Sequence, residues 1–198
     1  MSLRHALLGV LTARPMNGYS LARFFAGSQN WVWSAPQSQI YGALKTMETS
    51  GLIDASREEG QNGLETKVYS LTDEGVAELT RWVSTSHAPA PTRDAFALQA
   101  LYFDSIPAAD ARAVLEGYIR SQAQQLEEWE RHRDALANMD TSLLQERLKS
   151  RPMGEHRRIS RLKAHVFEGQ ILQAKARIDW AERALVLVGD AEGEDDEG

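Results

Sequence analysis

The segment 34–75 constrains the fold of this chain more than any other. Its first part reads as a capping box, with a serine cap at Ser34, a proline in the first turn and a glutamine at Gln37. Apolar residues then recur at helical spacing as far as Met47, and Gly51 supplies the left-handed residue that commonly ends a helix. The pattern predicts one amphipathic helix that ends just before this glycine.

Two short runs rich in β-forming residues follow, at 52–57 and 65–71, and a glycine-containing loop separates them. Thr72 is placed to cap a further helix, which we expect over 73–86. A helix, a two-strand hairpin and another helix, in this order, form the second half of a winged helix-turn-helix, a module that reads duplex DNA.

Two shorter helices are predicted ahead of this segment. One spans 3–13 and ends at Pro15, and Asn17 caps the other, over 18–26. Together with the next helix they make a helix-turn-helix core, to which the hairpin adds a wing. We therefore expect a mainly α fold with a small β-hairpin wing, and we assign residues 1–86 to a winged helix-turn-helix DNA-binding domain.

The rest of the chain reads as a separate helical domain. Residues 87–93 contain two prolines and read as a linker, and a long helix is predicted over 107–139 and another over 155–188. We assign 94–189 to a helical dimerisation and effector domain. The last nine residues, 190–198, include six acidic ones and are expected to form a disordered tail.

The last long helix carries a heptad repeat of apolar residues, spaced alternately by three and four. A helix of about 30 residues spans on the order of 45 Å and cannot bury such a face within one small domain. The face therefore predicts a partner helix from a second copy, or pairing with the 107–139 helix of the same chain, and one bundle can hold both. The predicted dimer seam consists of Phe167, Ile171, Ala174, Ile178, Ala181 and Leu185.

Charge and composition exclude several classes of function. The net charge is −6, but the tail supplies six of the 28 acidic residues, so the body holds 22 acidic and 22 basic residues. DNA binding then requires charges sorted by face instead of a bulk positive charge. The absence of cysteine excludes disulfides, thiolate metal sites and cysteine nucleophiles.

Other signals of location and catalysis are missing from the sequence. No apolar run approaches the roughly 20 residues that span a bilayer, and the N-terminus lacks a signal-peptide layout, so we expect a cytoplasmic location. The histidines do not fall at metal-ligand spacings, and no phosphate loop or nucleophile elbow occurs. We therefore expect no catalytic residues, no metal and no cofactor.

The helix that ends before Gly51 has a polar face suited to a DNA groove. In a major groove a glutamine can hydrogen-bond a base edge, and a lysine can reach a phosphate or a guanine. The alternative is an ordinary solvated helix face. The candidate DNA contacts on this helix are Gln37, Ser38, Tyr41, Gly42 and Lys45.

The hairpin and an upstream helix start add further candidates. Arg57, Asn62 and Lys67 lie in or beside the glycine-containing wing loop, which suits phosphates or a minor groove, and a plain surface hairpin is the alternative. Tyr19 can donate its hydroxyl to a phosphate at a helix start, or it can lie at the edge of the core.

Two tryptophans are candidates for effector binding. Trp31 and Trp33 can form flat walls for a planar ligand. The alternative is that they pack beside the helix that follows, which is the commoner role of such residues.

Several runs of residues, taken in order, resemble the PadR family of bacterial transcriptional regulators. Together they span about 70 residues, which is more specific than any single motif. The helical remainder resembles the virulence-activator type of C-terminal domain found in one PadR subgroup. The matching runs are 8–11 (LGVL), 17–21 (NGYSL), 39–44 (QIYGAL), 47–48 (ME), 51–53 (GLI) and 69–75 (YSLTDEG).

The resemblance implies a homodimer joined by its C-terminal helices, DNA contacts from the helix and wing residues named above, and repression of nearby promoters. Some relatives release DNA on binding phenolic acids or other planar compounds. The expected function is a dimeric, sequence-specific DNA-binding transcriptional regulator, a repressor that a small aromatic effector releases from a near-palindromic operator. The alternatives are a winged-helix protein–protein interaction module and a ligand-binding protein without strong DNA affinity.

Overall fold

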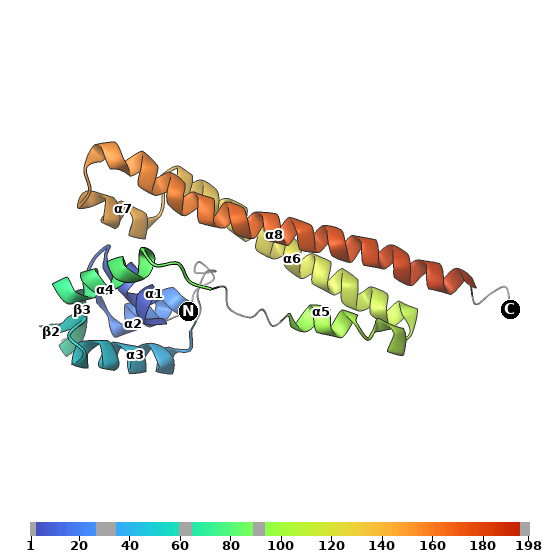
Figure 1. Ribbon diagram of the computed structural model, residues 1–198, viewed down its shortest axis with the longest axis horizontal. Coiled ribbons are helices and arrows are strands. Elements are labelled where there is room, and N and C mark those ends of the chain that lie inside the picture. Colours follow the sequence, from blue (N-terminus) through green and yellow to red (C-terminus); the bar gives the residue numbers. More distant parts are fainter. Residues whose placement is uncertain (1–2, 27–34, 60–64, 89–93, 195–198) are drawn as a thin grey trace. The chain divides into compact units, whose positions relative to one another are not determined.

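The computed structural model describes residues 3–26, 35–59, 65–88 and 94–194 (Figure 1). They belong to two compact units, one of residues 1–90 with 141–154 and one of residues 91–140 with 155–198. Helices predominate in the described ranges and their strands form one small sheet, so the predicted mainly α fold is confirmed. None of the helices in these ranges has both the length and the apolar character to span a membrane.

The first unit contains a helix-turn-helix core, a sheet and one added helix. Its elements are α1 (Leu3–Leu11), β1 (Met16–Asn17), α2 (Gly18–Ala26), α3 (Gln37–Thr49), β2 (Ile53–Glu59), β3 (Glu65–Leu71), α4 (Asp73–Val83) and α7 (Ser142–Lys149). The apolar faces of the helices enclose a single core, in which Leu7, Leu21, Ile40 and Leu44 are fully buried.

The sheet has the order β1-β3-β2, and all its pairs are antiparallel. β2 and β3 form the predicted wing hairpin, in register from Ile53 opposite Leu71 to Glu59 opposite Glu65. β1 was not predicted, because a strand of two residues is too short to show an alternating pattern. It places Met16 opposite Tyr69, and both residues are buried, so the wing is anchored to the core at this end.

The predicted helix signals at Asn17, Gly51 and Thr72 are confirmed. The Asn17 side chain accepts a hydrogen bond from the amide of Ser20 at 2.7 Å, and Thr72 accepts one from the amide of Gly75 at 3.1 Å. Gly51 has a φ of +68°, and the amide that follows it donates to the carbonyl of Met47. This is a Schellman ending, which satisfies carbonyls that the helix leaves open.

The predicted start of α3 is wrong. The helix begins at Gln37 with Pro36 as its N-cap, and no side-chain hydrogen bond caps it. Pro36 has a ψ of 146°, which is outside the helical region, and its carbonyl already accepts hydrogen bonds from the amides of Gln39 and Ile40. The proline therefore precedes the first turn instead of lying in it, and Ser34 lies outside the described residues.

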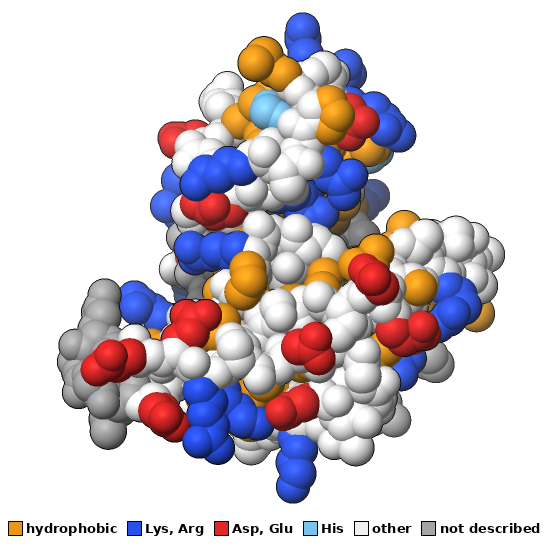
Figure 2. Space-filling view, turned by 90° about the vertical axis from the view of Figure 1, so that its left-hand side faces the viewer, with side chains coloured by type: hydrophobic (Ala, Val, Ile, Leu, Met, Phe, Trp, Pro, Cys, Tyr) orange, Lys and Arg blue, Asp and Glu red, His pale blue; other side chains and the backbone are white. Residues whose placement is uncertain are grey.

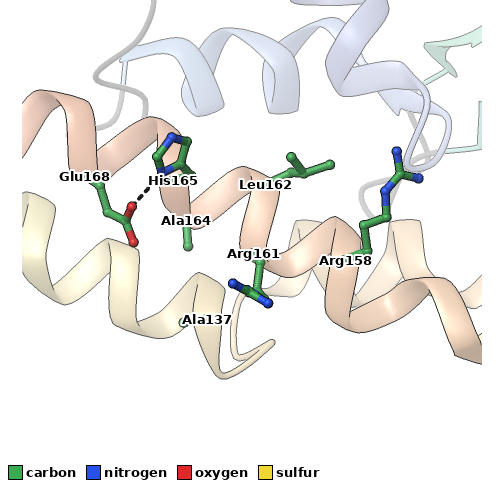
Figure 3. A pocket seen from close by; sticks show the side chains of 7 residues that line it. All are labelled: Ala137, Arg158, Arg161, Leu162, Ala164, His165 and Glu168. Carbon is green, nitrogen blue, oxygen red and sulfur yellow. Dashed lines mark hydrogen bonds and ion pairs between the residues drawn. The ribbon is translucent and has the colours of Figure 1, made fainter.

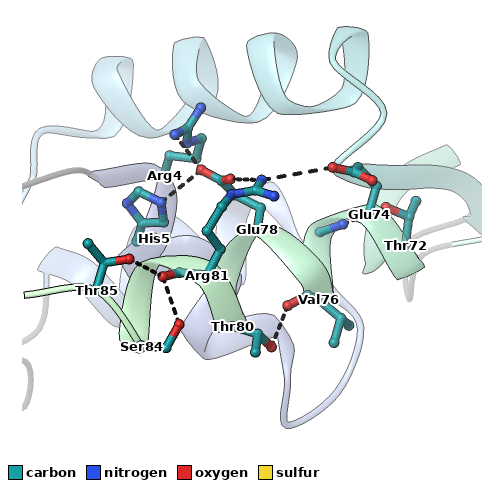
Figure 4. A network of polar contacts seen from close by, with 11 residues as sticks. Arg4, His5, Thr72, Glu74, Val76, Glu78, Thr80, Arg81, Ser84 and Thr85 are labelled. Atoms are coloured by element: carbon teal, nitrogen blue, oxygen red, sulfur yellow. Dashed lines mark hydrogen bonds and ion pairs between the residues drawn. The ribbon is translucent and has the colours of Figure 1, made fainter.

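A polar network joins α1 to α4 (Figure 4). The carboxylate of Glu78 accepts hydrogen bonds from Arg4 at 2.6 Å, from His5 at 3.0 Å and from Arg81. His5 is buried, and its ring stacks on Trp82 with centroids 4.7 Å apart. The hydrogen bonds from Arg81 and His5 hold the pKa of the Glu78 carboxyl below its usual range.

α7 belongs to the first unit, although we had assigned residues 94–189 to the second domain. Leu144 and Leu148 are buried, and Leu143 packs against the core of the first unit. The guanidinium of Arg147 donates to the carbonyl of Gly9 at 2.6 Å, and burial lowers its pKa. The Gly9 carbonyl near the end of α1 thus accepts hydrogen bonds both from the nearby Thr12 hydroxyl and from a side chain of α7.

The second unit is built on two long helices. Its elements are α5 (Ala95–Ala100), η1 (Phe103–Ser105), α6 (Ala108–Ala137) and α8 (Met153–Glu194), whose first two residues belong to the first unit. α6 and α8 lie side by side (Figure 1). They run antiparallel, since Ser160 donates to the carbonyl of Leu136 at 2.7 Å while Arg177 donates to the hydroxyl of Tyr118 at 2.8 Å.

The heptad face of α8 is used within the chain. Phe167, Ile171, Ala174 and Ala181 are buried, and Ile178 and Leu185 are half-buried. The ring of His132 on α6 contacts the edge of Phe167 at a centroid distance of 4.6 Å. The intrachain alternative therefore accounts for the four buried residues of this seam, and pairing of the half-buried Ile178 and Leu185 with a second copy stays a prediction.

α8 extends further than we predicted. It continues to Glu194, five residues into the segment expected to be a disordered tail from residue 190. Only residues 195–198 of that segment lie outside the described residues.

Candidate nucleic-acid interface

The five DNA-contact candidates on α3 share one exposed face. Ile40, Leu44 and Met47 are buried in the core, and this fixes the rotation of the helix about its axis. Lys45 forms no ion pair with any residue that the structure describes. The exposed candidates are Gln37, Ser38, Tyr41, Gly42 and Lys45.

The start of α2 lies against this face. A Cβ built at Gly18 would come within 2.5 Å of Cε1 of Tyr41, so a glycine is what allows the tyrosine ring to lie there. Tyr19, the next residue, is 63% exposed and is therefore not a core-edge tyrosine. The structure thus brings Tyr19 and Tyr41 to neighbouring turns of α2 and α3.

Both described basic candidates of the wing are paired with carboxylates. Arg57 on β2 lies 3.1 Å from Glu65 on β3, and both side chains are about 70% exposed. The Nζ of Lys67 lies 2.9 and 3.0 Å from the two carboxylate oxygens of Glu48 near the end of α3. The hydrogen bond to Glu48 raises the pKa of Lys67. Asn62, at the tip of the wing, lies outside the described residues.

Glu48 is the residue of this interface that sequence reasoning missed. It ends the predicted polar face as its first acidic residue, but the sequence has no signal that pairs it with a lysine 19 positions away. The space-filling view of Figure 2 shows acidic and basic side chains interspersed over the face that it displays. The arrangement agrees with the nearly balanced charge of the body of the chain.

A shallow groove of about 500 Å³ lies in the second unit, between the end of α6 and the first half of α8 (Figure 3). Nδ1 of His165 lies within hydrogen-bond distance, 2.5 Å, of a carboxylate oxygen of Glu168 on one side of it. The side chain of Arg161 points toward the end of α6, and that of Arg158 points away from it. Neither arginine is paired with a residue in the described ranges. Leu162, Ala164 and Ala137 supply an apolar wall.

An aromatic cluster joins the helices of the second unit near the start of α5. Phe96 stacks on Tyr118 with centroids 3.6 Å apart and meets the edge of Trp180 at 5.8 Å. Arg177 binds both the hydroxyl of Tyr118 and, at 2.7 Å, the carboxylate of Asp94, which also caps α5. No sequence pattern indicated this cluster, because its members come from three helices.

The remaining site predictions concern effectors and metals. Trp31 and Trp33, the candidate effector residues, lie outside the described residues. Within the described ranges, no three His, Asp or Glu side chains are grouped so that they could hold a metal ion.

A helix-turn-helix core, an antiparallel wing and an exposed polar helix beside that wing define the class of winged-helix DNA-binding proteins. The comparison with family models agrees. Residues 7–81 match the transcriptional regulator PadR-like family, and residues 92–188 match the virulence activator alpha C-terminal family.

Relatives of known identity extend this result. The chain is 31% identical to the negative transcriptional regulator PadR of Bacillus subtilis over 126 residues, which are 63% of this chain and 69% of that protein. The structure of B. subtilis PadR in complex with operator DNA has a TM-score of 0.72 to this chain at 26% identity, covering 94% of this chain and 98% of the other. The structure of the same regulator with p-coumaric acid has a TM-score of 0.66 at 25% identity, with coverages of 94% and 98%.

This chain belongs to the PadR-like family of transcriptional regulators. It is accordingly a DNA-binding regulator of transcription and not an enzyme.

Proposed function

We propose that this protein is a cytoplasmic, dimeric repressor that reads a near-palindromic operator and leaves it when a small aromatic acid binds. The observation that carries the proposal is the exposed face of α3, where Gln37, Ser38, Tyr41 and Lys45 lie together beside the wing. Small polar side chains and a single lysine on one helix face suit base edges and phosphates in a major groove. The relative with operator DNA supports this use of the fold.

The dimer that we propose uses the outward side of α8, because the heptad seam is already buried within the chain. On this outward side, exposed apolar side chains recur along the helix. Val166, Trp180 and Leu187 are separated by whole heptads, at 49%, 39% and 73% exposure. Such a stripe suits a second helix related by two-fold symmetry. Leu162 lies one turn before Val166, and Leu172 lies about a quarter-turn round the helix from these residues, at the edge of the exposed side. The members of this outer stripe are Leu162, Val166, Leu172, Trp180 and Leu187.

Two copies joined in this way would present two α3 helices to one side of a duplex. Half-sites should then be centred about one helical turn apart, roughly 34 Å. The repressive sense of regulation is supported by the relative's description as a negative regulator.

The effector part of the proposal is supported by the groove of the second unit and by the relative with p-coumaric acid, a phenolic carboxylate. Arg161 can pair with a carboxylate, and Leu162 and Ala164 can contact an aromatic ring. Titration with p-coumaric acid, followed by tryptophan fluorescence, tests this. Arg161→Gln should weaken the fluorescence change. A change identical to that of the wild type would show that the groove is not the effector site.

The DNA part is tested by selecting duplexes from a random pool with the purified protein. The enriched sequence should be a near-palindrome, and Lys45→Ala should bind it more weakly while lowering the log–log salt slope by about 0.9. Glu127→Gln, which changes an exposed charge on α6, is the matched control. A pool without enrichment at low salt would favour the alternative of a protein-interaction module, which the nearly balanced charge of the body also suits.

A further inference from the structure

We propose that Glu48 is a specificity-determining residue of the DNA interface, because its carboxylate withholds the wing lysine Lys67 from non-specific DNA. The inference rests on the proposed function, and it assigns a role to an acidic residue that does not itself suit DNA contact.

The first observation is the geometry of the pair. Both carboxylate oxygens of Glu48 accept hydrogen bonds from Nζ of Lys67, at 2.9 and 3.0 Å. Glu48 lies in the last turn of α3, and Lys67 lies on β3, the central strand of the sheet. The pair therefore spans the two elements of the interface, and the side chains are 34% and 49% exposed, within reach of a ligand.

The second observation is the arrangement of charge around the lysine. Lys67 lies directly opposite Arg57 in the hairpin register, so the two cations share one face of the wing. Each is matched by its own carboxylate, Glu48 for Lys67 and Glu65 for Arg57. The described part of the wing thus offers no unpaired cation to an approaching phosphate. Its two basic side chains alone therefore do not make it a strongly positive surface.

These charges act differently on random DNA and on an operator. On a random duplex the protein is held by phosphate contacts alone, so every available cation raises the affinity. A phosphate that binds Lys67 must displace the Glu48 carboxylate and then lie close to its negative charge. On an operator, contacts from α3 to base edges add to the phosphate contacts and make the affinity less dependent on one wing lysine. Glu48 should therefore lower the affinity for random-sequence DNA more than the affinity for the operator.

The experiment compares the wild type with Glu48→Gln, which keeps the size of the side chain and removes its charge. Binding is measured for a random-sequence duplex and for the duplex that the wild type selects, between 50 and 200 mM salt. We expect the variant to bind the random duplex about two- to fivefold more tightly at 100 mM salt, with a salt slope steeper by about 0.9, the value of one added phosphate contact. The ratio of operator to random affinity should fall.

Two further variants separate this role from a general change of charge. Asp54→Asn removes one charge from an exposed position on β2 that pairs with no residue in the described ranges, and it should leave the random-duplex slope unchanged. In the double variant Glu48→Gln with Lys67→Gln, the increase in affinity for the random duplex should disappear, because no lysine is then released. If Glu48→Gln has a melting temperature too low for the binding measurement, Glu65→Gln makes the same test on the pair of Glu65 with Arg57.

The outcomes are distinct. A Glu48→Gln protein that behaves like Asp54→Asn, or that loses affinity for both duplexes, overturns the inference and leaves the proposed function intact. A gain that persists in the double variant also overturns it, because Lys67 would not carry the effect. A wild type that selects no duplex and binds none at low salt overturns the proposed function itself.

Discussion

Gly75 in the first turn of α4 packs directly onto the carbonyl oxygen of Leu52: a Cβ at residue 75 would lie 2.0 Å from that oxygen. The same oxygen accepts the amide of Thr72, and Thr72 caps α4 through the amide of Gly75. The close approach therefore joins the end of the wing, the start of α4 and the residue directly before β2.

Gly75→Ala should destabilise the first unit strongly, because the obstacle is backbone and cannot rotate away. We expect a loss of about 1–3 kcal/mol or more in the free energy of unfolding, measured by urea denaturation. Gly9→Ala is the matched control, since no atom lies within 4 Å of a Cβ there. In the interior of α1 that alanine should stabilise the protein by about 0.5–1 kcal/mol. Equal effects of the two changes would contradict the packing argument.

Acid should weaken the junction of α1 and α4 through Glu78. The pKa of its carboxyl is lower in the folded state than in the unfolded state, first because of the hydrogen bond from Arg81 and then that from His5. Its contribution to stability is therefore present above the unfolded pKa of about 4.3 and is lost as the pH falls through the folded pKa. Glu78→Gln should lower the melting temperature at pH 7, and the difference from wild type should shrink below pH 4.

The control for this change is Glu74→Gln. Glu74 is exposed and lies 4.0 Å from Arg81, at the limit of an ion pair. Its replacement should change the melting temperature less than Glu78→Gln at pH 7. A Glu78→Gln deficit that stays constant from pH 7 to pH 3 would show that packing, and not ionisation, is responsible.

Met139 ends α6 with a φ of 60°, a left-handed conformation that costs a residue with a Cβ about 1–2 kcal/mol. Met139→Gly should relieve this, and after the entropic cost of glycine a net gain of about 0.5–1 kcal/mol in unfolding free energy should remain. The neighbouring residue Asn138 has a φ of −86°, so Asn138→Gly offers no such relief. Thermal denaturation of both variants checks the difference, and a Met139→Gly protein less stable than Asn138→Gly would refute it.

Ile171 and Leu172 are adjacent on α8, but they serve different surfaces. Ile171 is 4% exposed, so Ile171→Ala should cost about 2–5 kcal/mol in unfolding free energy. Leu172 is 68% exposed, so Leu172→Arg should leave the fold of the monomer intact and break the proposed dimer. Sedimentation equilibrium separates the two effects. A dimer that survives Leu172→Arg, together with Trp180→Arg, would rule out the outer stripe as the interface.

Local signals predicted most of the first unit. The caps at Asn17 and Thr72 and the stop at Gly51 were readable because each depends on residues within one helical turn. The start of α3 was misread because proline is common both just before and just inside a helix, and its ψ angle decides between the two. The inward face of α3 was also predictable, since it follows from helical spacing alone.

Contacts between distant segments were not predictable in the same way. The heptad of α8 correctly indicated a partner helix, but a single repeat cannot tell α6 of the same chain from a second copy. The pairs of Glu48 with Lys67 and of Arg177 with Asp94 join residues whose separation carries no periodic signal. The packing of α7 on the first unit was not predicted for a related reason, because the leucines of a short helix do not indicate which core they contact.

The placement of α7 has a practical consequence for anyone dividing this protein. Because the chain leaves the second unit after α6, supplies α7 to the first unit and then re-enters as α8, a cut in the 87–93 linker does not release an intact DNA-binding head. The fragment 1–86 would lose Leu143, which packs against its core, together with the arginine that donates to the Gly9 carbonyl. The chain also passes between the two units at three places instead of one, so three covalent connections link the long helices to the DNA-binding unit.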